Sequence, residues 1–366
     1  MSSDKLEVLR KKIDKIDDKI LELIEKRANL ARKIYEIKRR EGLEIFDSLR
    51  EDEKLKYVEQ KVSSFPKDSA KNIFVEIFSG TRKIWKELKI GYLGPEGSFS
   101  WEAANKIFGN SSSYISYHTL KDIFLYSELG ECDYGVVPLE NSRDGIVGET
   151  LDLLIDHNVK IVHEISIPVS FSFLSSIQDK SKIKRIYSHP KAIAQCSRWL
   201  RENFPGAEII YTNSTADGAK MAKEDSEGGA VGPSRLSHIF GLNILAEHIE
   251  DSHGEKTEFI VIKKKDRDDD FFRGRNRGRV LMRLSFCFSV KDEPGALFRV
   301  LEPLARRKIN MKKIHSRPDR NTKKYNFFIE IETNEKVRRE IEKVFEDIKK
   351  NVIFIKVFGE YSLRDF

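Results

Sequence analysis

Residues 6–37, LEVLRKKIDKIDDKILELIEKRANLARKIYEI, carry the most regular pattern in this 366-residue sequence. Apolar side chains recur there at alternating steps of three and four, namely at Leu6, Leu9, Ile13, Ile16, Ile20, Leu23, Leu30, Ile34 and Ile37. This spacing predicts one long helix with a single apolar seam. The same register requires an apolar residue at position 27, where the sequence has Arg27. A guanidinium on a buried seam needs an anionic partner, so Arg27 is a candidate functional residue.

The segment that contains this pattern, residues 1–88, is predicted to be entirely helical. Gly42 ends the first helix, a second begins near Asp47 and Ser48, and Pro66 starts a third, whose apolar pattern runs on to Ile84 and Leu88. One of these helices is about 50 Å long at ~1.5 Å per residue, and three such helices cannot enclose a core alone. We therefore expect two copies of the chain to intertwine.

Residues 89–264 have a different texture, in which short apolar stretches punctuated by Gly and Pro alternate with helical patterns. The stretches include IGYLG, YGVVPLEN, RIYSHP, EIIYT and EFIVIKK. This alternation predicts an α/β segment with mostly parallel sheets, in two lobes with a cleft between them. Ligands of such sheets lie beyond the carboxyl ends of the strands.

The last part of the chain is predicted to be an α+β domain. Residues 265–279 hold an acidic run followed by a basic run with glycines, which is typical of a solvated linker. From residue 280 apolar residues alternate strictly as far as residue 290, which indicates a strand with one apolar face. The patterns that follow complete a βαββαβ order for residues 280–366.

Composition narrows the class of protein. Hydrophobic residues make up 39% of the chain and charged residues 34%, which indicates soluble globular domains. No stretch approaches the ~18 consecutive apolar residues of a membrane span, and we expect a cytoplasmic protein. Its three cysteines have no CxxC spacing, so neither disulfides nor a zinc site is predicted. The net charge is +7, but the Lys and Arg residues are interleaved with Asp and Glu rather than gathered into one stripe, so nucleic-acid binding is not indicated. A small anionic substrate explains the excess of positive charge as well.

Residues 4–88 resemble the all-helical chorismate mutases. Arg27 and Lys38 are three helical turns apart and share a face of the first helix, so their long side chains can converge on one ligand. The resemblance implies that a set of polar positions contacts chorismate: Arg10 (in the partner's site of a swapped dimer), Arg27, Lys38, Asp47, Arg50, Glu51, Thr81 and Trp85. Trp85 stands where the family usually has Gln or Glu. The rearrangement of chorismate is pericyclic, so Arg and Lys side chains that bind the substrate in a compact conformation are sufficient for catalysis. Neither cofactor nor metal is expected.

Residues 90–264 resemble the prephenate dehydratases. The resemblance rests on five motifs in order, YLGPEGSFSWEAA, YGVVPLENSRDGIV, YSHPKAIAQCSRWL, YTNSTADGA and DSHGEKTEFIVI. It implies that the cleft is lined by catalytic Asn141, Ser188, Gln195 and Thr257, with substrate-binding Ser98, Ser214 and Thr215. In the family the hydroxyl at Thr257 donates a proton to, or orients, the leaving water.

Some of these residues also have simpler interpretations. Asn141 in PLENS is equally typical of a turn, and Ser188 of a plain loop. Ser188 beside His189 suggests a serine hydrolase, but adjacent strand residues point to opposite faces and the GxSxG elbow is missing. Glu258 stands where the family has Arg, and Arg143 or Arg235 would have to compensate if that Arg contacts substrate.

Residues 280–366 resemble the ACT regulatory domains that follow such dehydratases. Two motifs carry the resemblance and would bind phenylalanine: Gly295, Ala296, Leu297 and Phe298, and then His315, Ser316, Arg317 and Pro318. His315 replaces the Glu of the family. A dimerising module that binds no ligand is the alternative.

The order of the resemblances predicts a bifunctional enzyme that converts chorismate to prephenate and prephenate to phenylpyruvate, under feedback by L-phenylalanine, as a homodimer or dimer of dimers. Two alternatives stay open. In the first alternative, the chain is a sensor of amino acids that has lost catalysis, as the changes at Trp85, Glu258 and His315 suggest. In the second, the dehydratase acts on arogenate instead of prephenate. A nucleic-acid binder lacks support, since no basic stripe with stacking aromatics is present.

Overall fold

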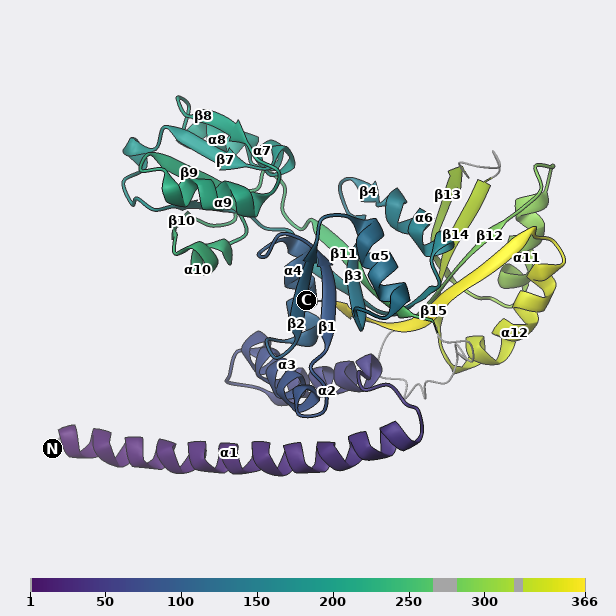
Figure 1. Cartoon of the computed structure of the whole chain (residues 1–366), viewed down its shortest axis with the longest axis horizontal. Helices are drawn as coiled ribbons and strands as arrows, with labels where there is room; N and C mark the ends of the chain where they lie inside the picture. The colour runs from purple at the N-terminus through teal and green to yellow at the C-terminus, as the bar shows by residue number, and fades with distance from the viewer. Residues whose placement is uncertain (1, 266–281, 319–324, 366) are drawn as a thin grey trace. The chain divides into compact units, whose positions relative to one another are not determined.

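The computed structural model describes residues 2–265, 282–318 and 325–365 (Figure 1). The chain forms two compact units. The first comprises Met1–Leu88 and Phe108–Ser113, and the second comprises Lys89–Ile107 and Tyr114–Phe366. Of the predicted linker at residues 265–279, all but residue 265 lies outside the described residues.

The first unit is built on three helices, as predicted: α1 (Ser2–Arg40), α2 (Ser48–Lys61) and α3 (Lys67–Lys83). The chain leaves α1 through Gly42, which has a left-handed φ of 66° that favours glycine. Asp47 caps α2 by accepting a 3.0 Å hydrogen bond from the Arg50 backbone N–H. The third helix is shorter than the sequence pattern predicts. It ends at Lys83, so Ile84 and Leu88 lie beyond its last residue.

The apolar seam of α1 is not covered by any other part of the chain that the structure describes. Its side chains are among the most exposed large apolar groups of the described residues, for example Ile13 at 56% and Leu23 at 63%. The buried core of this unit is instead small, and it consists of Leu55, Val75 and Phe78 with Phe74 packed against it. The apolar side chains of the longest helix therefore form an exposed hydrophobic face.

The second unit contains a large mixed sheet with the strand order β13-β14-β12-β15-β5-β11-β3-β1-β2, and β4 pairs with β3. Its N-terminal strands are β1 (Lys89–Leu93), β2 (Ser113–Tyr117), β3 (Tyr134–Asn141), β4 (Gly145–Ile146), β5 (Val159–Pro168) and β11 (Lys256–Lys264). Its associated helices are α4 (Phe99–Phe108), α5 (Leu120–Leu129) and α6 (Gly148–Asp156).

A five-stranded sheet of order β10-β6-β9-β7-β8 forms the other lobe of the predicted α/β segment. Its strands are β6 (Ser172–Ser175), β7 (Arg185–Ser188), β8 (Glu208–Tyr211), β9 (Gly228–Gly232) and β10 (Asn243–Ala246). Its helices are η1 (Lys180–Lys182), α7 (Pro190–Gln195), α8 (Ser197–Asn203), α9 (Thr215–Glu224) and α10 (Leu236–Phe240).

The sheets are mixed rather than mostly parallel. β11 runs antiparallel to both β3 and β5. The reason is the path of the chain, since β5 leads out of the large sheet toward β6 and β11 returns from β10 beside it. The two strands that join the lobes therefore pair with each other.

The C-terminal part has the predicted βαββαβ order: β12 (Met282–Ser289), α11 (Ala296–Arg306), β13 (Met311–Pro318), β14 (Tyr325–Thr333), α12 (Glu335–Lys349) and β15 (Phe354–Asp365). Its helices pack over the strands through a core that includes Phe286, Val300 and Ile341 (Figure 1). It also continues the large sheet, because β15 pairs in parallel with β5, with Ser362 opposite His163. The sequence patterns did not indicate this junction.

The long helix α1 is charged throughout, and none of the helices in the described ranges has the length and hydropathy needed to cross a membrane.

Candidate active sites

Arg27 is the centre of the candidate site in the helical unit. Its Nη1 donates a 2.9 Å hydrogen bond to Thr81 Oγ1, and its guanidinium lies 5.1 Å from the ring centroid of Phe78. Burial lowers the pKa of Arg27, while Tyr35 and Glu51 nearby favour its charged form. Glu51 therefore supplies a negative charge near Arg27, while the hydrogen-bond partner of the guanidinium is the hydroxyl of Thr81.

Lys38 holds the loop that joins α1 to α2. Its Nζ donates a 2.9 Å hydrogen bond to the Glu44 carbonyl oxygen and lies 3.8 Å from Asp47 Oδ2. Asp47 in turn caps α2, and Arg50 reaches Glu53 at 3.3 Å. Lys38 and Asp47 therefore form one cluster, whereas the exposed side chain of Arg50 points to the neighbouring turn of its own helix.

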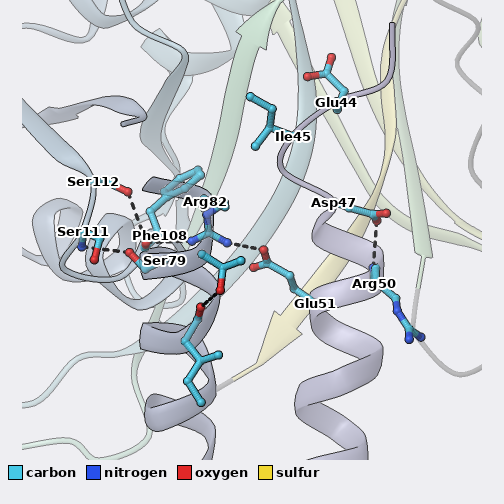
Figure 2. Close-up of polar contacts among 12 residues, drawn as sticks. Glu44, Ile45, Asp47, Arg50, Glu51, Ser79, Arg82, Phe108, Ser111 and Ser112 are labelled. Carbon is cyan, nitrogen blue, oxygen red and sulfur yellow. Dashed lines mark hydrogen bonds and ion pairs between the residues drawn. The ribbon is translucent and has the colours of Figure 1, made fainter. Parts of the chain in front are cut away.

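Glu51 has a partner that the sequence reasoning missed, Arg82. Figure 2 shows the Arg82 guanidinium hydrogen-bonded to Glu51, while its Nη2 donates a 2.8 Å bond to the Phe108 carbonyl oxygen. Arg82 is only 2% exposed and lies over the ring of Phe46 at 5.5 Å. The signal available in the sequence was its place on the apolar face of α3, four residues after Phe78.

The segment Phe108–Ser113 completes the helical unit although it follows α4. Its backbone N–H at Ser111 donates a 2.9 Å hydrogen bond to Ser79 Oγ on α3 (Figure 2). Asn110 Nδ2 donates one of 2.8 Å to Glu76 Oε1, also on α3. The buried Arg82 and its Phe108 contact are therefore part of a wider attachment to α3.

Trp85 and Arg10 lie apart from this cluster. The ring of Trp85 lies 6.4 Å from that of Tyr35, with the Arg39 guanidinium 5.7 Å from its centroid. Arg10 is exposed on α1, about 25 Å from Arg27 at ~1.5 Å per residue. Within one chain the structure does not bring Arg10 to the other candidates.

In the second unit, Asn141 and Thr257 meet across paired strands. They are direct register partners on β3 and β11, and Asn141 Nδ2 donates a 2.8 Å hydrogen bond to Thr257 Oγ1. Asn141 Oδ1 also accepts from the backbone N–H groups of Arg143 and Asp144 at 2.9 and 3.1 Å. Asn141 therefore both closes a turn and orients the threonine hydroxyl.

Gln195 reaches the same region from α7. Its Nε2 donates a 2.8 Å hydrogen bond to Glu255 Oε2, and Arg143 Nη1 lies 3.5 Å from the other oxygen of Glu255. Glu255 immediately precedes β11, two residues before Thr257. Gln195 is thus linked through one carboxylate to the turn that begins at Asn141.

Ser188 is fully buried and donates a 2.6 Å hydrogen bond to the Val231 carbonyl oxygen. The neighbouring His189 caps α7, and burial lowers its pKa. Because Ser188 Oγ is held by a backbone acceptor on β9, the geometry favours a structural role over nucleophilic attack.

The remaining predicted anchors also have local partners. Ser214 caps α9 by accepting from the Asp217 N–H at 2.9 Å, and Thr215 begins that helix. Ser98 donates to the Leu93 carbonyl oxygen at 3.0 Å. Arg235 donates a 2.9 Å hydrogen bond to the carbonyl oxygen of Gly97 and thereby secures the loop of Ser98.

Glu258 is not compensated by Arg143 or Arg235, which are engaged with Glu255 and with Glu102. Its partner is Lys313 on β13, a residue that the sequence reasoning did not single out. The second motif of the C-terminal part, residues 315–318, lies on the same strand, where His315 and Arg317 are half-buried and Ser316 and Pro318 are exposed.

The first motif of the C-terminal part, residues 295–298, opens α11. Gly295 has a left-handed φ of 79° and precedes buried Ala296, half-buried Leu297 and Phe298, which is 65% exposed. On β13, Arg317 Nη2 bonds Asp152 Oδ2 of α6 at 2.6 Å. One residue of the second motif, Arg317, therefore contacts residues 89–264.

Comparison with known proteins places these sites in a family. The family models that match are Chorismate mutase type II over residues 9–86, Prephenate dehydratase over residues 90–267 and ACT domain over residues 285–350. A bifunctional chorismate mutase/prephenate dehydratase of Aquifex aeolicus is 38% identical over 364 residues, covering 98% of both chains. One of Stutzerimonas stutzeri is 32% identical over 371 residues, again with 98% of both chains.

The solved structures agree. The prephenate dehydratase of Arthrobacter aurescens in complex with L-Phe is 27% identical and superposes with a TM-score of 0.66, covering 75% of this chain and 89% of that chain. The three predicted fold classes, helical, α/β and βαββαβ, are confirmed. The chain belongs to the family of bifunctional chorismate mutase/prephenate dehydratases.

Proposed function

We propose that the helical unit rearranges chorismate to prephenate, that the α/β segment converts prephenate to phenylpyruvate, and that L-phenylalanine bound to the C-terminal part inhibits the chain. The hydrogen bond between Asn141 and Thr257 is the observation that carries the dehydratase assignment. This hydrogen bond connects two motifs that are far apart in the sequence, and through it the Asn141 amide orients the Thr257 hydroxyl.

The mutase step requires binding of a dianion in a compact conformation. Arg27 and Lys38 lie on one face of α1, about 16 Å apart at ~1.5 Å per residue. Thr81 fixes the Arg27 guanidinium at 2.9 Å. We assign Arg27 and Lys38 to the substrate carboxylates, with Asp47, Arg50 and Glu51 along the start of α2 and the indole N–H of Trp85 as a donor.

The dehydratase step expels carbon dioxide and the ring hydroxyl, and the new aromatic ring provides the driving force. Thr257 accepts a hydrogen bond from Asn141, so its own O–H points away from that amide and is available to the departing hydroxyl. Thr257 thereby stabilises the charge that develops on the leaving oxygen. Gln195, Ser98, Ser214 and Thr215 are assigned to positioning of substrate carboxylates, with Ser188 as a support beneath them.

We assign the uncovered seam of α1 to a second copy of the chain. Nine apolar side chains of this helix recur on one face; eight of them are more than half exposed, and Ile20 is 49% exposed. A partner helix would bury them and bring the partner's Arg10 to the site of this chain. The proposed assembly is a homodimer or a dimer of dimers, and sedimentation of the purified chain tests it.

We assign L-phenylalanine to the two motifs at residues 295–298 and 315–318. The left-handed Gly295 at the start of α11 permits close approach of a ligand to backbone N–H groups. Titration calorimetry with L-phenylalanine, with L-tyrosine as the control, tests this assignment; no heat with either ligand supports the alternative of a module without ligand.

A cytoplasmic location completes the proposal, and it is supported by the buried thiols Cys132, Cys196 and Cys287. The decisive experiment supplies prephenate and arogenate side by side and measures phenylpyruvate and phenylalanine. Turnover of prephenate supports the proposal, turnover of arogenate alone favours the other substrate, and ligand binding without turnover favours a sensor.

A further inference from the structure

Lys313 of β13 lies between two carboxylates of the dehydratase strands. Its Nζ is 2.7 Å from Glu140 Oε2 on β3 and is hydrogen-bonded to Glu258 Oε2 on β11. The three side chains are largely buried, with exposures of 19%, 26% and 25% for Lys313, Glu140 and Glu258. Burial alone would lower the pKa of Lys313, but the two adjacent carboxylates raise it, so the ammonium stays charged.

The two carboxylates face each other directly. Glu258 and Glu140 are register partners in the antiparallel pair of β11 and β3. Like charges in this arrangement repel and destabilise the strand pair. The next register pair is Thr257 with Asn141, the two residues whose side chains are hydrogen-bonded. A repulsive pair is therefore adjacent to the candidate catalytic pair, and Lys313 neutralises it.

A second contact fixes β13 to the same region. Arg317, which lies on the same face of β13 as Lys313, bonds Asp152 of α6. It also packs on Gly148 at the start of that helix, where a Cβ would lie 1.9 Å from Arg317 Nη1. The turn that begins at Asn141 leads through β4 into α6. β13 thus contacts the chain on both sides of this turn.

We propose that Lys313, which belongs to the C-terminal part, is a positioning residue for the dehydratase step. It holds Glu140 and Glu258 together and thereby keeps Asn141 and Thr257 at hydrogen-bonding distance. The inference rests on the proposed roles of Asn141 and Thr257. The same strand, β13, carries the motif at residues 315–318. A movement of β13 when an amino acid binds to this motif would therefore be transmitted through Lys313 to Asn141 and Thr257.

The test compares Lys313→Met with the matched control Lys312→Met in the full-length protein. Lys312 is the preceding residue on β13 and pairs with Glu332 at 2.8 Å on the strand's other side. For Lys313→Met we expect kcat on prephenate to fall about tenfold or more, since small misplacements of catalytic groups are costly. KM should stay within about twofold, because ground-state binding is retained. Mutase activity, and every constant of Lys312→Met, should be unchanged.

Rescue variants separate positioning from general damage to the fold. Lys313→Arg retains the charge and should keep most of the activity. Lys313→Glu should be worse than Lys313→Met, and adding Glu258→Lys to it should restore activity because the cluster again holds one cation and two anions. If Lys313→Met fails to fold, the triple variant K313M/E140Q/E258Q lacks both the lysine and the repelling carboxylates, so it should fold and keep most of the dehydratase activity.

Three results would overturn the inference: a kcat of Lys313→Met equal to that of Lys312→Met, a raised KM at constant kcat, or no recovery in the charge-reversed and triple variants. Failure of the proposed function is distinguishable, because the unsubstituted protein would then not turn over prephenate at all.

Discussion

Arg82 on α3 and Glu51 on α2 form a buried ion pair, and the same guanidinium donates a 2.8 Å hydrogen bond to the carbonyl oxygen of Phe108 (Figure 2). The Arg82 side chain is 2% exposed and that of Glu51 is 13% exposed. Arg82 thus connects α3 to α2 and to the Phe108–Ser113 segment, next to Arg27 and Thr81.

The first prediction concerns this pair. Arg82→Gln leaves the Glu51 carboxylate buried without its cation, which destabilises by about 3–5 kcal/mol, and misplaces Glu51 in the mutase site. We expect a lower unfolding temperature of the helical unit and a loss of mutase activity, measured by calorimetry and by chorismate consumption. Lys83→Gln, in an exposed pair with Glu87, is the control. Equal effects of the two substitutions would show that the Arg82 pair has no special role.

The second prediction concerns Thr257. Thr257→Val keeps the shape of the side chain but removes the hydroxyl that Asn141 orients. Dehydratase kcat should fall about 10²-fold, the usual range for a lost proton donor, while Thr257→Ser should retain most of it. Mutase activity of the same preparations provides the reference. A Thr257→Val protein with normal kcat on prephenate would exclude the assigned role.

The third prediction concerns the α1 seam. Ile20→Asn introduces a polar group into the exposed apolar face, whereas Lys19→Asn changes the neighbouring polar face. Sedimentation should show dissociation only for Ile20→Asn, with mutase activity falling as the partner's Arg10 is lost. Two variants with the same sedimentation coefficient would mean that this seam is not the interface.

The fourth prediction concerns pH. Burial, reinforced by the nearby Glu330 and opposed by Arg283, raises the pKa of Glu164 to about 8. A carboxyl whose folded pKa exceeds its unfolded value of about 4.3 stabilises the fold below that unfolded value. This contribution is lost as pH rises through the folded pKa.

The unfolding temperature of the unsubstituted protein should therefore decrease between about pH 5 and pH 8, and Glu164→Gln should flatten this decrease. Glu332→Gln, at a more exposed carboxylate, should leave the profile unchanged. Parallel profiles for all three proteins would contradict the assignment of the transition to Glu164.

Local patterns predicted much of this fold. The apolar spacing of residues 6–37 predicted α1, and Gly42 and Asp47 predicted where helices end and begin, since caps and periodicity depend on near neighbours. Alternation after residue 280 predicted β12 for the same reason. The end of α3 was placed too late, because the Trp85 N–H bonds the Arg82 carbonyl oxygen at 2.9 Å and tightens the last turn.

Long-range partners could not be predicted from these patterns. Arg82 meets Glu51 across 31 residues and Lys313 meets Glu258 across 55. Neither pairing produces a periodic pattern of residues in the sequence. The same holds for β15, whose pairing with β5 depends on how the C-terminal part meets the large sheet. The motifs located Asn141 and Thr257, and only the strand register showed that they are bonded.

The central claim, that one chain carries two separate active sites, is tested most directly by supplying chorismate alone and following chorismate, prephenate and phenylpyruvate over time. The unsubstituted protein should form phenylpyruvate, Thr257→Val should accumulate prephenate, and Arg27→Leu should leave chorismate intact while still converting added prephenate. Loss of both steps in either variant, or consumption of chorismate by Arg27→Leu at the normal rate, would contradict the account.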